Sequence, residues 1–263
     1  MVDNLVKSFG GVRALDGVSL TLAPREIVGV IGPNGSGKTT LLNIVSGLYR
    51  PDRGAIRLFG RDITRSPPFA IARQGVARTF QQIDLADELT VLDNVAVARA
   101  TREGAGLFRS ILTIGPDRRL AAARQMAMTA AEMLGVAEHA MRPCGVLPYG
   151  TRRRVEVARA LASAPRLMLL DEPAAGLNEE EQRDLARRIR CIADEGVTVL
   201  VIEHNLVFLR ALAERLVCLD RGRVIASGSP EDVQRDPSVI EAFLGRQETA
   251  EEWTKSAGER KLG

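Results

Sequence analysis

The ten residues "IGPNGSGKTT" at positions 31–40 constrain the fold more than any other stretch of the chain. They follow the continuous apolar run "IVGVIG" at 27–32, which is typical of a strand buried on both faces. They lead directly into the helical pattern "KTTLLNIVSGL". A loop of the form G-x-x-x-x-G-K-[ST] between a strand and a helix directs backbone N–H groups at a phosphate. The sequence therefore predicts a P-loop inside an α/β domain.

This P-loop predicts an ATP site that also holds Mg²⁺. In the motif the lysine reaches the β- and γ-phosphates, and the hydroxyl that follows it is a ligand of the metal. These roles fall to Lys38 and Thr39. Lysine occurs only at positions 7, 38, 255 and 261, so a lysine at this place in the loop is informative. The predicted ATP-binding residues of the loop are Gly32, Pro33, Asn34, Gly35, Ser36, Gly37, Lys38, Thr39 and Thr40.

Two acidic residues end a second apolar run, "RLMLLDEP" at 166–173. A carboxylate at the end of a buried strand can hold Mg²⁺ through water, and the next one can activate the attacking water. We therefore expect Asp171 to be a metal residue and Glu172 to be the general base. The alternative, an ordinary surface turn with two acids, is disfavoured downstream of a P-loop.

Strand and helix patterns alternate along the chain, which favours a largely parallel sheet with helices packed on it. The pattern turns helical from about 84 to 164, where Thr90 and Asp93 have the spacing of a capping box, and Ser229 with Pro230 begins a later helix. The expected domains are an α/β core at 1–83 and 165–246, an inserted α-helical subdomain at 84–164, and a polar tail at 247–263. The expected strands are 27–32, 55–59, 76–80, 166–171, 197–202, 216–220 and 224–228.

Composition excludes several classes of protein. Lys+Arg 36 against Asp+Glu 33 leaves a net charge of +3 without a long basic block, so we expect no nucleic-acid partner. No apolar run approaches the roughly 18 residues of a membrane helix. The cysteines at 144, 191 and 218 are too widely spaced for a metal motif, and we expect them to be core residues of a reduced, cytosolic protein.

The stretch "LPYGTRRRVEVARAL" at 147–161 predicts a second anion site. A Pro-Tyr-Gly turn, a basic run and apolar positions at helical spacing indicate the exposed start of a helix. Its first N–H groups and its arginines are expected to face outward, toward an anion.

Taken together, these motifs resemble those of ATP-binding-cassette ATPases over almost the whole chain. The P-loop, "LPYG", "LLDEP", "AAGLN" at 174–178 and "VIEHN" at 201–205 occur in the order and approximate spacing of that family. Within it the chain is similar to the ATP-binding subunit of branched-chain amino acid uptake transporters. That similarity lies in "ARTFQ" at 77–81, "GLF" at 106–108, the "YG" of the signature, "DEPAAGLN" and the ending "SPEDVQRDPSVIEAFLG".

The resemblance implies a P-loop ABC-type core that hydrolyses ATP to power an importer for branched-chain or related amino acids. It implies a peripheral subunit at the cytoplasmic face of the inner membrane, with two transmembrane permease subunits and, indirectly, an extracytoplasmic solute-binding protein. It also implies a second ABC ATPase subunit, in a heterodimer or a homodimer.

Residue roles follow from the same resemblance. Phe9 would stack on adenine. Gln81, favoured over the adjacent Gln82, would contact Mg²⁺ and the attacking water, and His204 would hold the γ-phosphate and help to position Glu172. The metal set is thus Thr39, Gln81 and Asp171, and the catalytic set is Glu172, His204, Gln81 and Lys38.

In this family the signature of one ATPase meets the ATP bound to its partner, which explains a second anion site. The signature residues here are Leu147, Pro148, Tyr149, Gly150 and Thr151, of which Pro148, Tyr149 and Thr151 replace the usual Ser, Gly and Gln. Gly176, Leu177 and Asn178 would lie in the loop that crosses the dimer interface, and Asn178 is also expected to cap the helix that follows.

Three matters stay open at this stage. A lipopolysaccharide-export ATPase has a similar "RRRVEVARAL" segment, although "ARTFQ" and "GLF" argue against it, and soluble ABC ATPases usually carry two cassettes or a long coiled-coil arm. Relatives carry several more apolar residues before the equivalent of "NLVKSFGG", so the first strand is short, the start site is misassigned, or an upstream domain is missing. The transported solute would be selected by the permeases and the binding protein.

Overall fold

The computed structural model describes residues 1–103 and 116–244. The "GLF" segment at 106–108 and the predicted tail at 247–263 lie outside the described residues. The chain divides into two compact units, unit 1 with Met1–Ile71 and Thr198–Gly263 and unit 2 with Ala72–Val197. The domain division at 83/84 and 164/165 stays a prediction.

A mainly parallel sheet forms the core of unit 1. Its central strand β3 (Ile27–Ile31) pairs in parallel with β8 (Thr198–Ile202) and β9 (Arg215–Asp220), and β10 (Arg223–Gly228) is antiparallel to β9. All residues of β3 and β8 are buried, as their continuous apolar runs predicted. The largely parallel α/β fold class is therefore confirmed.

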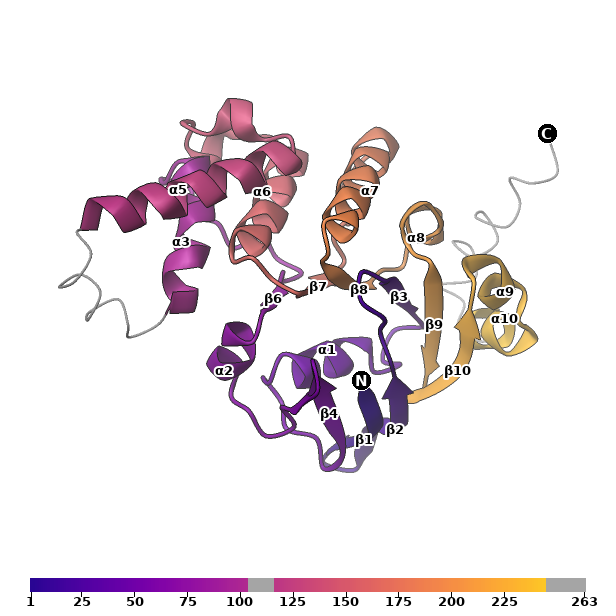
Figure 1. The fold of residues 1–263 in the computed structure, drawn as a ribbon. Helices are drawn as coiled ribbons and strands as arrows, with labels where there is room; N and C mark the ends of the chain where they lie inside the picture. Colours follow the sequence, from indigo (N-terminus) through magenta and orange to yellow (C-terminus); the bar gives the residue numbers. More distant parts are fainter. Residues whose placement is uncertain (104–115, 245–263) are drawn as a thin grey trace, which may run out of the picture. The chain divides into compact units, whose positions relative to one another are not determined.

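Among the described residues, four helices lie wholly within unit 1, and α9 and α10 lie against β10 (Figure 1). Ser229 caps α9 as expected, because its Oγ accepts a hydrogen bond from the Asp232 N–H at 3.2 Å. The four are α1 (Lys38–Val45), α8 (Leu206–Leu212), α9 (Pro230–Arg235) and α10 (Pro237–Leu244), and the short α2 (Pro68–Arg73) lies at the boundary of the two units.

Unit 1 also contains an antiparallel sheet that the sequence analysis largely missed. Its strand order is β2-β1-β4-β5, with bounds β1 (Val2–Phe9), β2 (Val12–Leu20), β4 (Arg53–Leu58) and β5 (Arg61–Asp62). Register shifts interrupt the pairing of β1 with β2, so the buried side chains of β1 do not alternate regularly along the sequence.

Unit 2 combines two parallel strands with the predicted helical insertion. Strand β6 (Val76–Arg78) pairs in parallel with β7 (Leu167–Asp171). Helices α3, α5 and α6 lie against one another (Figure 1), and α5 also contacts α7. The bounds are α3 (Val91–Glu103), α5 (Pro116–Met133), α6 (Tyr149–Ala162) and α7 (Glu179–Asp194), with 3₁₀ turns at Ala137–His139 and Cys144–Val146.

The cap of α3 differs in detail from a capping box. The Asp93 N–H donates to Thr90 Oγ1 at 3.1 Å, as expected, but the Asp93 carboxylate accepts from the Thr90 hydroxyl at 2.7 Å and not from its backbone. Cys144 and Cys218 are buried, and burial raises the pKa of the Cys218 thiol to about 12. The expectation for Cys191 is wrong: it is exposed on α7, whose buried face carries Leu185, Ile189 and Ile192.

Among the described residues, no helix combines the length and the apolar character that crossing a membrane requires.

Candidate functional site

The P-loop forms at the carboxyl end of β3. Gly32 has φ 148, and a Cβ there would lie 2.7 Å from Ser36 Oγ and even closer to the Leu219 carbonyl oxygen, so only glycine fits. Helix α1 begins at Lys38, directly after Gly37. The loop thus delivers a helix N-terminus to the strand end, which is the arrangement that binds anions.

The side chains of the loop match an anionic ligand. Lys38 is only 6% exposed, and its Nζ donates to the carbonyl oxygens of Gly32 at 2.7 Å and Pro33 at 3.1 Å, so its cation lies folded over the loop. Ser36 Oγ is buried and has no hydrogen-bond partner within the described part of the chain. A phosphate in the loop would accept a hydrogen bond from the Ser36 hydroxyl and lie beside the Lys38 cation. Of the other predicted loop residues, Asn34, Gly35 and Thr39 are exposed, Thr40 and Gly37 are half-buried, and Pro33 is buried.

Neighbouring backbone holds the P-loop in place. The Gly222 N–H, in the turn between β9 and β10, donates to the Ser36 carbonyl at 2.9 Å. The Gly222 carbonyl in turn accepts from the Asp16 N–H of β2 at 2.8 Å. The loop is therefore tied to β2 and to the β9–β10 turn within unit 1.

His204 lies at the same edge of the unit 1 sheet as the P-loop. Strands β3 and β8 run in parallel with Val30 opposite Ile202, so the residues after both strands emerge at one edge. His204 is partly exposed between β8 and α8. Its backbone N–H donates to Glu203 Oε2 at 3.1 Å, and the Glu203 side chain is buried. Glu203 was not predicted, and its only sequence signal is its place beside His204.

Phe9 is an exposed aromatic and not a core residue. Its side chain is 43% exposed and meets Tyr49 edge-on, with ring centroids 5.2 Å apart, and Lys7 Nζ lies 5.3 Å from the Phe9 ring centroid. An exposed aromatic pair offers a face on which a base can stack. The adenine role of Phe9 stays a prediction, and Tyr49 was not predicted.

Asp171, at the end of β7, is buried against a cation. Arg78 Nη2 lies 3.1 Å from Asp171 Oδ2, and each side chain is 8% exposed. Burial raises the pKa of the Asp171 carboxyl, and the hydrogen bond and charge of Arg78 oppose that shift. The backbone of Asp171 is also held in place by Thr79, whose Oγ1 accepts a hydrogen bond from the Asp171 N–H at 3.3 Å. Arg78 belongs to the "ARTFQ" segment, whose sequence predicted no role for this arginine.

Gln81 and Glu172 meet side chain to side chain. Because β6 and β7 are parallel, the residues that follow them share one edge, and Gln81 Nε2 donates to Glu172 Oε2 at 3.0 Å. Glu172 has φ 49, a left-handed conformation that is uncommon for a non-glycine residue. Gln82 is exposed. The structure therefore brings together two residues that were expected to act on the same water.

The signature forms the start of α6. Helix α6 begins at Tyr149, and Pro148 is its N-cap residue without a side-chain cap. Leu147, Gly150 and Thr151 are buried, whereas Tyr149 is exposed. The helix N-terminus that the sequence predicted is therefore present, and it begins at Tyr149.

The loop Gly176–Asn178 packs beside this signature. Gly176 approaches the Tyr149 ring so closely that a Cβ would lie 2.8 Å from Cε1. Asn178 caps α7 as predicted, accepting from the Glu181 N–H at 3.0 Å, and Glu181 completes a capping box by accepting from the Asn178 N–H. Leu177 is buried.

The expectation that the arginines after the signature all face outward is wrong for Arg153. Its side chain is 1% exposed and donates to Glu156 Oε2 at 2.8 Å. The helical period is the reason, because Arg153, Glu156 and Val157 fall on the face of α6 that is buried.

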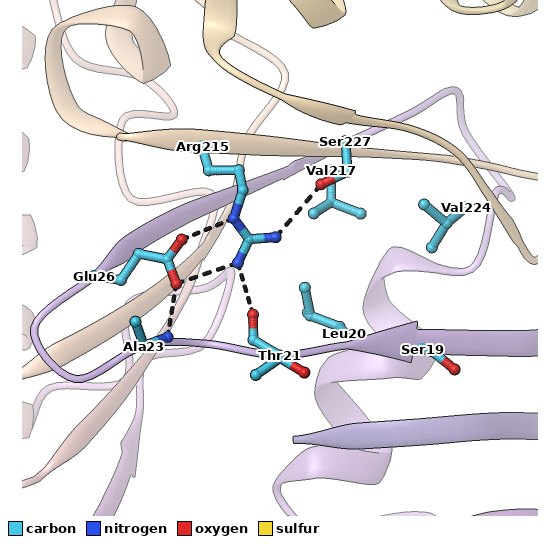
Figure 2. A pocket seen from close by; sticks show the side chains of 9 residues that line it. All are labelled: Ser19, Leu20, Thr21, Ala23, Glu26, Arg215, Val217, Val224 and Ser227. Carbon is cyan, nitrogen blue, oxygen red and sulfur yellow. Dashed lines mark hydrogen bonds and ion pairs between the residues drawn. The ribbon is translucent and has the colours of Figure 1, made fainter.

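A separate pocket of about 470 Å³ lies near the start of β9, and no P-loop residue lines it (Figure 2). Arg215 crosses the pocket, donating to both carboxylate oxygens of Glu26 at 2.7 and 3.1 Å and to the Thr21 carbonyl at 2.6 Å. Burial acts to raise the pKa of Glu26, but hydrogen bonds from Arg215 and the Ala23 N–H outweigh it and lower the pKa. The charges of Arg215 and Glu26 thus have their partners within unit 1. The pocket is lined by Ser19, Leu20, Thr21, Ala23, Glu26, Arg215, Val217, Val224 and Ser227.

Comparison with known proteins agrees with this geometry. The family model described as ABC transporter matches residues 15–175, and the model described as branched-chain amino acid ATP-binding cassette transporter matches 223–249. The high-affinity branched-chain amino acid transport ATP-binding protein LivG of Salmonella typhimurium is 41% identical over 246 residues, covering 93% of this chain and 96% of LivG. Its counterpart BraF of Pseudomonas aeruginosa is 41% identical over 249 residues, with coverage of 93% and 96%.

Solved structures give the same result. A nucleotide-free ATP-binding cassette from an ABC transporter matches with a TM-score of 0.82 and 31% identity, covering 93% of this chain and 98% of that one. The ADP conformation of an ATP-binding cassette also has a TM-score of 0.82, with 30% identity and the same coverage. The chain therefore belongs to the ABC transporter family, as a cassette that binds and hydrolyses ATP.

Proposed function

We propose that this chain is the ATPase subunit of an importer for branched-chain or related amino acids. The names of its relatives and the match of the branched-chain model at 223–249 support the solute class. The contact of Gln81 with Glu172, beside the buried Asp171, carries the assignment of the hydrolytic residues. The subunit would act at the cytoplasmic face of the cell membrane, with two permease subunits, a second ATPase subunit and, indirectly, an external solute-binding protein.

The P-loop residues bind the phosphates of ATP in this proposal. Lys38 and the N–H groups at the start of α1 neutralise and orient the β- and γ-phosphates. Thr39 and Gln81 would hold Mg²⁺ through their side-chain oxygens and Asp171 would hold it through water, and the metal when bound would neutralise charge on the transferring phosphoryl group. Phe9 stacks on the adenine ring.

Glu172 is the general base of the reaction. A water held by Glu172 and Gln81 attacks the γ-phosphorus in line, the bond to the β–γ bridging oxygen breaks, and ADP leaves. Glu172 accepts the proton of that water, and His204 holds the γ-phosphate while the charge shifts. The left-handed backbone of Glu172 sets the direction of its carboxylate toward Gln81.

The signature, from Leu147 to Thr151, meets the ATP of the partner subunit, and Gly176, Leu177 and Asn178 cross the dimer interface. Pro148 offers neither a hydroxyl nor an N–H where the usual signature has serine. The ATP site that this signature completes is therefore the weaker of the two in a heterodimer.

Replacing Lys38 by alanine tests the phosphate site. We expect ATPase turnover to fall at least about a hundredfold, because the lost group acts on the transferring phosphate. The variant should stay folded, since the hydrogen bonds of Lys38 to the Gly32 and Pro33 carbonyls lie within the loop itself. Unchanged turnover in the folded variant would reject the assignment.

The solute class is tested in membrane vesicles that contain the assembled transporter and its binding protein. ATP should drive the uptake of labelled leucine, isoleucine or valine, and the Lys38→Ala variant should abolish that uptake. ATP-driven transport of an unrelated solute, or stable assembly with a lipopolysaccharide-export permease, would reject the import assignment while leaving the ATPase intact.

A further inference from the structure

A buried ion pair in unit 2 has no role in the hydrolytic scheme. Arg153 and Glu156, both on α6, lie 2.8 Å apart (Nη1 to Oε2), and each side chain is 1% exposed. Burying two charges costs about as much free energy as their attraction returns, so the pair by itself is a weak source of stability. The role of the two side chains is therefore indicated by the other groups to which they form hydrogen bonds.

The pair holds the backbone that follows β6. Arg153 Nη2 donates to the Gln81 carbonyl at 3.0 Å, and Nη1 donates to the Phe80 carbonyl at 3.2 Å. Glu156 Oε1 accepts from the Phe80 N–H at 3.2 Å. Both polar groups of the Phe80 backbone and the carbonyl of Gln81 are therefore bound to α6, more than 70 residues away in sequence.

The same guanidinium reaches the general base. Arg153 Nη2 donates to the Glu172 carbonyl at 3.3 Å. Glu172 has a left-handed backbone with φ 49, which persists only where surrounding contacts hold it. A planar guanidinium can bind two carbonyls from one nitrogen while its other nitrogen holds a carboxylate, which an ammonium on a flexible stem cannot do with the same geometry.

We propose that Arg153 is a positioning residue for ATP hydrolysis, which fixes the backbones of Gln81 and Glu172 so that their side chains meet. Since Arg153 lies on the helix that begins with the signature, it also links the signature to the base of the same chain. A shift of α6 upon docking of the partner's nucleotide reaches Gln81 and Glu172 through one side chain. This inference rests on the roles proposed above for Gln81 and Glu172.

The variant Arg153→Lys tests the proposal in the purified chain or its ATPase assembly. It keeps a positive charge beside Glu156, so the chain should stay folded with a thermal midpoint lowered by a few degrees, about 2 to 4 °C per kcal/mol lost with the carbonyl hydrogen bonds, and ATP affinity should stay within about twofold. We expect kcat to fall about ten- to a hundredfold, because one ammonium cannot hold both carbonyls. The double variant Arg153→Gln with Glu156→Gln removes both charges together and should show the same loss if the single variant folds poorly.

A second readout does not depend on activity. In the nucleotide-free chain, Arg153→Lys should speed hydrogen exchange of the Phe80 and Gln81 amides about tenfold or more, because the backbone they belong to loses its anchor. The matched control is Arg188→Lys. Arg188 donates to Asp184 at 2.7 Å and to the Met133 carbonyl at 3.0 Å, so it also joins a carboxylate on its own helix to a distant carbonyl. The kcat of Arg188→Lys and the hydrogen-exchange rate of its Phe80 amide should match those of the wild type.

Wild-type kcat in Arg153→Lys, or an equal fall in Arg188→Lys, would overturn the proposal. So would a fall in kcat that comes with matching losses of ATP affinity and thermal midpoint, since that pattern indicates general loosening. Glu172→Gln is measured in parallel. If Glu172→Gln keeps its turnover, the proposed role of Glu172 fails; if it is inactive while Arg153→Lys has wild-type kcat, only the role of Arg153 fails.

Discussion

Alanine substitutions at Gly32 and Gly35 should differ sharply in their effect on stability, although both residues lie in the P-loop. At Gly32 the backbone has φ 148, and a Cβ would lie 2.7 Å from Ser36 Oγ and closer still to the Leu219 carbonyl oxygen. Backbone strain and overpacking each cost about 1 to 3 kcal/mol, so we expect Gly32→Ala to destabilise the chain by about 4 kcal/mol. At Gly35 the backbone has φ 77 but a Cβ would meet nothing within 4 Å. Only the left-handed conformation is penalised there, at about 1 to 2 kcal/mol.

The assay is thermal unfolding without nucleotide, because ligand binding would itself shift the midpoint. For a chain of this size, at about 2.5 °C per kcal/mol, about 4 kcal/mol corresponds to a fall of about 10 °C, against about 2.5 to 5 °C for Gly35→Ala. Both variants should bind ATP poorly, so ATP affinity does not separate them. Equal midpoints for the two variants would show that the loop relaxes around a side chain at Gly32, and the steric argument would be refuted.

Three further predictions concern the other parts of the site and the pocket. Glu172→Gln should still bind ATP with Mg²⁺ but hydrolyse it very slowly. Nucleotide-bound dimers of the variant, with itself or with the partner ATPase, should therefore accumulate and be detected by size-exclusion chromatography. Wild-type hydrolysis would mean that another group is the base. Pro148→Ser places a hydroxyl at the N-cap of α6, which should add about 1 kcal/mol to the stability of the chain and raise turnover at the weaker ATP site. An unchanged thermal midpoint together with unchanged turnover would contradict this. Glu26 has a lowered pKa, so its stabilising effect is complete above its ordinary value of 4.5 and is lost as pH falls through the folded-state pKa. Glu26→Gln should therefore lower the thermal midpoint at pH 7 but not in strong acid, whereas a deficit that does not change with pH would count against the ion pair.

Features that depend on neighbouring residues in the chain were predictable from the sequence. The buried strand β3, the P-loop and α1 follow one another within about twenty residues, and each has a strong local pattern. The caps at Asn178 and Ser229 are local for the same reason. Strand β2 was missed because Arg13 and Asp16 interrupt its apolar residues and because register shifts break its pairing with β1.

Contacts between distant residues were not predictable. The pair Arg78–Asp171 joins residues 93 positions apart, and only the parallel pairing of β6 with β7 brings them together. Arg153 was expected to face outward, toward an anion, because it follows the predicted start of a helix, and its burial depends on Glu156 and on carbonyls from two other segments. The family resemblance predicted that Gln81 and Glu172 both act on the attacking water. It did not predict the hydrogen bond between their side chains.

The hydrogen bonds that tie Ser36 and Asp16 to Gly222 have a consequence for the kinetics of nucleotide capture. A loop whose Ser36 carbonyl is already held by Gly222, which is itself held by Asp16, loses little conformational entropy when a ligand arrives, so no slow ordering step precedes binding. Association should then be a single rapid phase whose rate rises linearly with ATP concentration. If one of these hydrogen bonds were removed, the loop would have to become ordered at the moment of binding, and that entropic cost would lower ATP affinity. No group that touches phosphate would be altered.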